Sequence, residues 1–191
     1  SDPIKMEIQV EAFAWKTNDE LNDMTFYRYK MINRASEVLD STFFGMFADI
    51  DLGCSEDDFV GVDVERSLAY AYNEDNQDGV TGCLCPVGTG ITPTYCNDIP
   101  MIGLDYFRGP LGPFVYDSMA MEFRKANIGE TPDTIMELGM TSFVYFTREG
   151  QGTTDPDNGP EFYNYLTGSW KDGTRITFGG TGYNPGSTDF I

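Results

Sequence analysis

Acidic residues cluster between positions 49 and 78. Ten of the 31 aspartates and glutamates of the chain lie in this stretch, together with a single base, Arg66. Carboxylates at this density repel one another in a folded protein unless they are solvated, share protons or bind a cation. Calcium takes about six to eight oxygen ligands from carboxylates, amides and backbone carbonyls. The cluster therefore predicts a cation site.

The first part of the cluster supplies the predicted ligands. In "DIDLG", two aspartates alternate before a glycine that lets the chain turn, and the next segment adds three more aspartates. Magnesium is less suitable because it requires stricter octahedral geometry. We expect structural Ca²⁺ as the cofactor, and its predicted ligands are Asp49, Asp51, Asp57, Asp58 and Asp63.

Two other acidic loops are weaker candidates. "EDNQDG" follows the start of an EF-hand loop with Glu74, Asn76 and Asp78, but its twelfth position falls on Cys85 where a glutamate is needed. "DPDNG" offers Asp155, Asp157 and Asn158. The alternative for every such loop is a solvated turn, since Asp, Asn and Gly favour turns for backbone reasons alone.

The sequence identifies no catalytic residue. It contains no histidine, so a Ser-His-Asp or Cys-His arrangement is excluded. Asp57 and Asp58 are adjacent, and on a strand they would face opposite sides instead of flanking one glycosidic bond. Aromatic residues at strand spacing could stack on sugars, but this pattern is more typical of a core. They are Tyr27, Tyr29, Tyr70, Tyr72, Tyr106, Tyr163, Tyr165 and Trp170.

The chain has four cysteines, at spacings that do not match the paired C-x2-C of zinc sites. We expect two disulfides among Cys54, Cys83, Cys85 and Cys96, and hence an oxidising, extracellular setting. Pairing does not follow from spacing. Cys83 and Cys85 are poorly placed to bond each other, so each should bond either Cys54 or Cys96.

Composition limits the partners of the chain. A net charge of −19 and a pI near 4.1 argue against nucleic acid and against anionic membrane surfaces, both of which would repel the protein. No run of about 18 apolar residues is present, so we expect no membrane insertion.

Short alternating or β-branched runs separated by Gly, Asn, Asp and Pro predict an all-β fold. We expect residues 1–191 to form a single antiparallel β-sandwich, jelly-roll-like, with a long disulfide-bearing loop over 74–100. Only 117–127 has a helical pattern. The predicted strands are 4–14, 24–33, 41–49, 59–64, 67–73, 101–107, 141–147, 161–170 and 174–180.

Several segments together resemble a known family. They are, in order, "FADIDLGCSEDDFVGVDVER", "YNEDNQDG", "MIGLDYFRGPLG" and "FYNYLTGSWKDGTRITFGGTGYNPG". The chain resembles a region of large secreted Bacteroidota surface proteins exported by the type IX secretion system. In that family an aromatic-x-D-x-D-L-G segment precedes a D-D-Y/F-V-G-x-D run. One departure is Phe47, where relatives often carry Trp.

The resemblance implies a location outside the cell and a parent protein with several domains, of which this chain would be an excerpt. We expect a calcium-stabilised, non-enzymatic module of a cell-surface protein with an adhesion or structural role. Its partners would be neighbouring domains of the parent chain, other surface proteins or glycans. Two alternatives remain: a carbohydrate-binding or carbohydrate-active domain, and a subunit of an extracellular filament.

Overall fold

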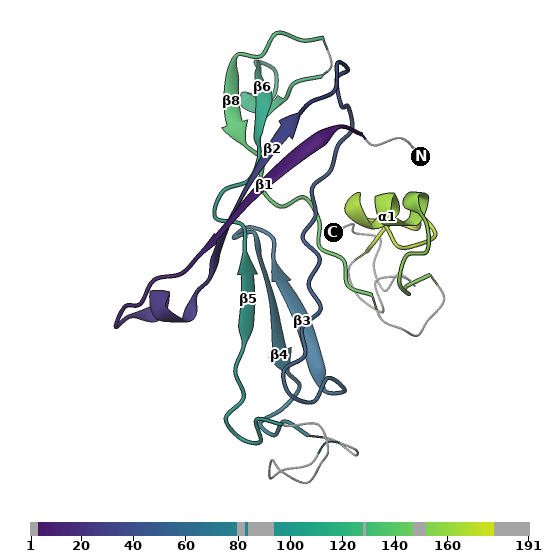
Figure 1. The fold of residues 1–191 in the computed structure, drawn as a ribbon. Helices are drawn as coiled ribbons and strands as arrows, with labels where there is room; N and C mark the ends of the chain where they lie inside the picture. The colour runs from purple at the N-terminus through teal and green to yellow at the C-terminus, as the bar shows by residue number, and fades with distance from the viewer. Residues whose placement is uncertain (1–3, 80–82, 84–93, 128, 147–151, 178–191) are drawn as a thin grey trace. The chain divides into compact units, whose positions relative to one another are not determined.

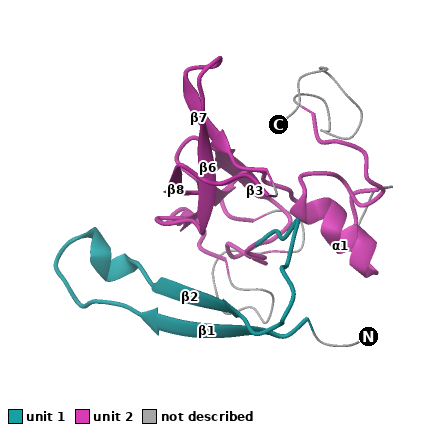
Figure 2. Cartoon of the chain, turned by 90° about the horizontal axis from the view of Figure 1, so that it is seen from above, with its two compact units in different colours: residues 1–44 teal, residues 45–191 magenta. Residues whose placement is uncertain are grey.

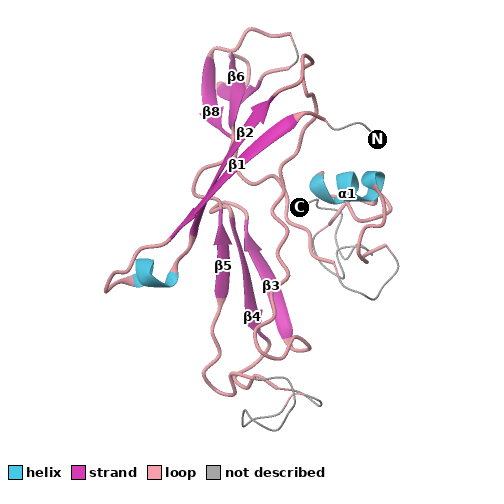
Figure 3. Cartoon of the chain, viewed as in Figure 1, coloured by secondary structure: helices cyan, strands magenta, loops and turns pink. Residues whose placement is uncertain are grey.

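The computed structural model describes residues 4–79, 83, 94–127, 129–146 and 152–177. Contacts within the chain separate two compact units, residues 1–44 and 45–191 (Figure 2). Antiparallel strands dominate both, and the described part of the chain contains one α-helix (Figures 1 and 3). None of the described helices has the length and hydrophobicity needed to cross a membrane.

The first unit is a hairpin of β1 (Met6–Phe13) and β2 (Phe26–Asn33). Their antiparallel register pairs Val10 with Tyr29 and confirms the two strands predicted from alternation. The 3-10 helix η1 (Glu20–Asp23) lies in the connection between them. It begins where the Asp19 carboxylate accepts the backbone N–H of Leu21, as is usual for an N-cap.

The first sheet of the second unit consists of β3 (Asp58–Asp63), β4 (Leu68–Asn73) and β5 (Ile102–Asp105), in that order. All three strands were predicted from the sequence. The register pairs Asp58 with Asn73 at one end of the β3–β4 ladder and Asp63 with Leu68 at the other. Two of the predicted metal ligands are therefore at opposite ends of one strand.

The second sheet has the order β7-β6-β8, formed by β6 (Leu111–Asp117), β7 (Glu122–Lys125) and β8 (Thr134–Glu137). The helix predicted over 117–127 is wrong. One carboxylate oxygen of Asp117 accepts the backbone N–H groups of Met119 and Ala120 at 2.9 and 3.2 Å, and Met121 adopts a φ of +58°. These contacts close a turn between β6 and β7, since aspartate competes for backbone N–H groups that a helix would use.

The strand predicted over 161–170 is also wrong, because α1 (Gly159–Leu166) occupies most of it. The Asn158 side chain accepts the N–H of Glu161 at 3.2 Å, and the Glu161 carboxylate accepts the N–H2 of Asn158 at 2.7 Å. Pro160 follows directly after the first residue of the helix, where its missing N–H costs nothing. These start signals outweigh the β-propensity of the aromatic residues that follow.

Of the predicted sandwich, the coarse feature is confirmed: the fold is mostly β, with three antiparallel sheets. The face-to-face packing of a sandwich or jelly roll stays a prediction. In the described residues, 41–49 and 141–146 form no strand, and 174–177 forms isolated bridges instead of a strand, among them the bridge between Ser169 and Arg175. Residues 147 and 178–180 of these predicted strands lie outside the described residues.

A small aromatic core lies beside α1. Tyr165, Trp170 and Ile176 are buried together, and Val144 and Phe146 pack against them. The Phe146 ring stacks on Tyr165 with centroids 5.0 Å apart. For Tyr165 and Trp170, the interpretation as core residues is confirmed. For Tyr27 and Tyr29 it is wrong, because both are more than half exposed on the β1–β2 hairpin.

Replacing Trp170 by alanine should destabilise the second unit by about 3 to 5 kcal/mol, the usual cost of truncating a large buried aromatic side chain. Trp170 is only 1% exposed. The measurement is urea unfolding followed by far-UV circular dichroism. Phe162→Ala, which truncates a 55% exposed ring on α1, should change stability by no more than about 0.5 kcal/mol. Equal losses for the two variants would contradict the assignment of this core.

A candidate metal centre

Three side chains from two loops meet at one point. Cys54 and Asp57 lie just before β3 and Asp78 follows β4, and one potential ligand atom from each lies within 4.8 Å of the others. All three are buried, with Asp57 3% exposed and Asp78 fully enclosed. The half-buried Asp58 and the buried Asn73, paired at the adjoining end of β3 and β4, extend this group.

Backbone N–H groups position the carboxylates of Asp58 and Asp57. One oxygen of Asp58 accepts the N–H of Leu52 at 2.8 Å. One oxygen of Asp57 accepts the N–H of Gly79 at 3.0 Å, from the loop that carries Asp78. The two loops therefore hold each other through the acidic side chains.

Asp78 is held by both of its oxygens. One accepts the N–H of Cys54 at 2.9 Å and the other accepts the N–H of Tyr95. Gly53 allows this approach, because a Cβ atom there would lie 2.1 Å from an Asp78 oxygen and its φ is +82°. A side chain at position 53 would both clash and strain the backbone.

Three oxygen atoms in this group are buried without a hydrogen-bond partner. They are Oδ1 of Asp57, Oδ1 of Asp58 and Oδ1 of Asn73. In the described part of the chain, neither aspartate forms an ion pair with a lysine or arginine. Burying such oxygens unpaired is costly, and a bound cation would relieve that cost.

The pKa of Asp58 is raised by its surroundings. Burial raises the pKa of its carboxyl above the ordinary value, and the negative charges of Asp57, Asp78 and Asp51 raise it further. The hydrogen bond from Leu52 acts in the opposite direction but does not outweigh them. Ionised Asp58 is therefore disfavoured in the fold when no positive charge is near.

The sulfur atom in the group is not a thiolate. Cys54 is bonded to Cys83, which confirms one of the two pairings left open for Cys83. Cys96 is also disulfide-bonded, and Cys85 lies outside the described residues. Since a soft thiolate ligand is absent from the group, the available donors are carboxylate and amide oxygens, which suit a hard cation.

Most of the other predicted ligands lie outside this buried group. Asp49 and Asp51 are exposed on the segment before β3, and the charge of Asp51 reaches Asp58. Asp63, at the far end of β3, is paired with Arg66, whose side-chain hydrogen bond lowers the pKa of Asp63. Of the weaker candidates, Asp78 belongs to the centre, whereas Glu74 and Asn76 are exposed.

Asn73 was missed by the sequence reasoning. The signal that could have found it is pairing: two strands joined by a short turn, with register Asp58 to Asn73, place an amide beside the acidic loop.

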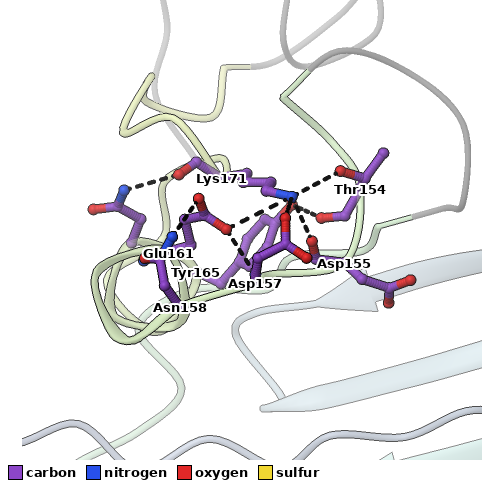
Figure 4. A network of polar contacts seen from close by, with 8 residues as sticks. Thr154, Asp155, Asp157, Asn158, Glu161, Tyr165 and Lys171 are labelled. Carbon is purple, nitrogen blue, oxygen red and sulfur yellow. Dashed lines mark hydrogen bonds and ion pairs between the residues drawn. The ribbon is translucent and has the colours of Figure 1, made fainter.

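In the loop at 155–158, a lysine side chain compensates the negative charge of Asp157. The Lys171 ammonium donates to the Asp155 carbonyl and the Asp157 carboxylate, each at 2.7 Å (Figure 4). The hydrogen bond to Asp157 raises the pKa of Lys171. Asn158 caps α1. A lysine therefore occupies the position that a cation would take among these oxygens.

Comparison with known proteins gave no match: no family model fits the sequence, and neither a curated protein nor a solved structure is significantly similar to it. The function therefore has to be argued from the site.

Asp58→Asn should raise the melting temperature of chelator-treated protein at pH 7, because it removes a negative charge that partial burial and the neighbouring carboxylates disfavour. The pKa of Asp58 is raised in the fold, so the penalty of its ionised form is present at neutral pH. The penalty fades as the pH falls through that raised pKa, and is gone below the ordinary value of 3.8. The gain over wild type should therefore shrink between pH 7 and pH 4, as measured by thermal unfolding.

The matched control is Asp63→Asn, which makes the same charge change on the same strand. The pKa of Asp63 is lowered by Arg66, so this variant should lower the melting temperature at pH 7. A lower melting temperature for Asp58→Asn in chelator would show that its carboxylate is not disfavoured.

Proposed function

We propose that this chain is a calcium-stabilised, non-enzymatic module of an extracellular or cell-surface protein with an adhesion or structural role. One observation carries the proposal: Asp57, Asp58 and Asn73 each bury an unpartnered oxygen beside the buried carboxylate of Asp78. A cation supplies the positive charge and the missing contacts together.

The chemistry of the donors favours calcium. The proposed ligands are Asp57, Asp58, Asn73 and Asp78, and Asp51 is a further carboxylate whose charge acts on Asp58. Calcium accepts carboxylate and amide oxygens in irregular geometry on loops, whereas magnesium requires a near-ideal octahedron and zinc prefers nitrogen and sulfur. The absence of histidine from the sequence also disfavours zinc.

Two further considerations support the location. The Cys54–Cys83 disulfide is typical of oxidising compartments, where calcium is also abundant. The resemblance to secreted Bacteroidota surface proteins points to the same setting and to neighbouring domains or surface glycans as partners.

A cavity favours a second candidate function, carbohydrate binding. It has a volume of about 240 Å³ and borders the proposed ion site at Asn73. Its lining mixes amide, carboxylate and aromatic groups, which is the chemistry that recognises sugar hydroxyls and ring faces. The lining residues are Tyr72, Asn73, Asp75, Asn76, Asn97, Ile99, Pro100 and Met101.

The hairpin of the first unit favours the filament alternative. In the described residues β1 and β2 pair only with each other, so each leaves one edge without a strand partner. Such edges can pair with strands of another chain. Ile8, Val10, Tyr27 and Tyr29 also leave more than half of their surface exposed on one face.

The calcium proposal is tested by titrating chelator-treated protein with CaCl2 in a calorimeter and by thermal unfolding. We expect saturable binding and a higher melting temperature, since an ion at a hundred times its dissociation constant adds about 2.7 kcal/mol of stability. Asp57→Asn should weaken binding roughly tenfold or more, because it removes a ligand charge. Glu74→Gln makes the same charge change at an exposed position and should bind like wild type. No heat of binding and an unchanged melting temperature would refute the proposal.

A further inference from the structure

The Cys54–Cys83 disulfide forms part of the wall of the proposed ion site. Cys54 is fully buried, and its Sγ atom lies within 4.8 Å of carboxylate oxygens of Asp57 and Asp78. Its backbone N–H donates to Asp78 at 2.9 Å. The residue that carries the cross-link therefore also positions a proposed ligand.

The other half of the disulfide fixes the second loop. Cys83 lies against Gly79, whose N–H holds Asp57: a Cβ atom at Gly79 would be 3.3 Å from the Cys83 carbonyl oxygen. The bond to Cys54 joins residues 29 positions apart, so it closes the chain segment that contains β3, β4 and the loop with Asp78.

A second cysteine holds the backbone of the same residue, Asp78. The backbone N–H of Asp78 donates to the Cys96 carbonyl at 2.7 Å, and the two residues form an isolated β-bridge. Cys96 is itself disulfide-bonded. Asp78 is therefore held between two cross-linked cysteines, one on each side.

The disulfide and a bound ion each reduce the free-energy cost of forming this site. Without either, three carboxylates have to be brought together against their mutual repulsion, and two loops have to be ordered. A disulfide restricts the chain before the ion arrives, so that less ordering remains when the ion binds. An ion in place neutralises the carboxylates and favours the arrangement in which Cys54 and Cys83 are adjacent.

We propose that the Cys54–Cys83 disulfide and the ion stabilise each other: the cross-linked chain binds calcium more tightly, and the calcium-bound chain resists reduction. The inference rests on the proposed calcium site. Linkage requires reciprocity, so the factor by which reduction weakens calcium binding equals the factor by which calcium opposes reduction.

The redox step is ordinary thiol–disulfide exchange with a dithiol. A thiolate of the dithiol attacks one sulfur of the pair, the Cys54–Cys83 bond breaks, and the departing cysteine takes up a proton. The second thiol of the dithiol then resolves the mixed disulfide. The dithiol is oxidised by two electrons, and Cys54 and Cys83 gain one hydrogen each.

The first test compares calcium affinity, by calorimetry, between wild type and a C54A/C83A double variant that keeps the disulfide of Cys96. We expect the dissociation constant to rise at least about tenfold in the variant. If wild type binds no calcium, both the proposed function and this coupling fail. If wild type binds and the variant binds equally tightly, only the coupling fails.

The second test uses the unmodified protein, so it does not depend on whether the double variant folds. Wild type is equilibrated in dithiothreitol redox buffers with either calcium or EDTA, the thiols are alkylated, and the Cys54 and Cys83 peptides are quantified by mass spectrometry. Calcium should lower the equilibrium constant for reduction at least tenfold, a shift of about 30 mV. In Asp57→Asn the shift should be reduced, and an equal degree of reduction with calcium and EDTA in wild type would overturn the proposal.

Discussion

The repulsion among Asp57, Asp58 and Asp78 is the constraint on which the surrounding structure depends. Backbone N–H groups offset part of it: Leu52, Cys54, Gly79 and Tyr95 all donate to these carboxylates. Such donors carry only partial charges, so they position a carboxylate without neutralising it. The conformations of the loops before β3 and after β4 therefore include several backbone N–H groups that point at the carboxylates, and the negative charge of the group is only partly offset.

The chain meets the same problem in two ways. Around α1, the Lys171 ammonium lies among the oxygens of Thr154, Asp155 and Asp157 (Figure 4). At the acidic centre, formed by the segments before β3 and after β4, no described lysine or arginine forms an ion pair with Asp57 or Asp58. With 31 acids against 12 bases, the chain cannot give every acidic loop its own basic side chain. The proposed cation would supply the positive charge that the second group lacks.

Local patterns allowed much of the fold to be predicted. Alternation and short aromatic or β-branched runs between turn residues were sufficient for β1 to β5, and spacing was sufficient to exclude a bond between neighbouring cysteines. The hydrophobic pattern gave the wrong element where a side chain bonds to backbone N–H groups. Asp117 forms a turn within the helix predicted over 117–127. Asn158 caps a helix that replaces most of the strand predicted over 161–170. The candidate site was predicted in part, since Asp57 and Asp58 are local features. Asp78 and Asn73 join them only through the register of β3 and β4, which acidic spacing does not encode.

The small size of the core explains why polar groups and cross-links matter so much here. Among the described residues, the buried apolar side chains are few and fall into two sets, one near each polar network. Leu52, Cys54 and Ala71 belong to the segments that build the acidic centre, and Tyr165, Trp170 and Ile176 lie beside Lys171. Each set is too small to order its loops by hydrophobic burial alone. The Cys54–Cys83 disulfide and the backbone hydrogen bonds to Asp57, Asp58 and Asp78 order the loops of the acidic centre, so this centre is a structural element of the fold.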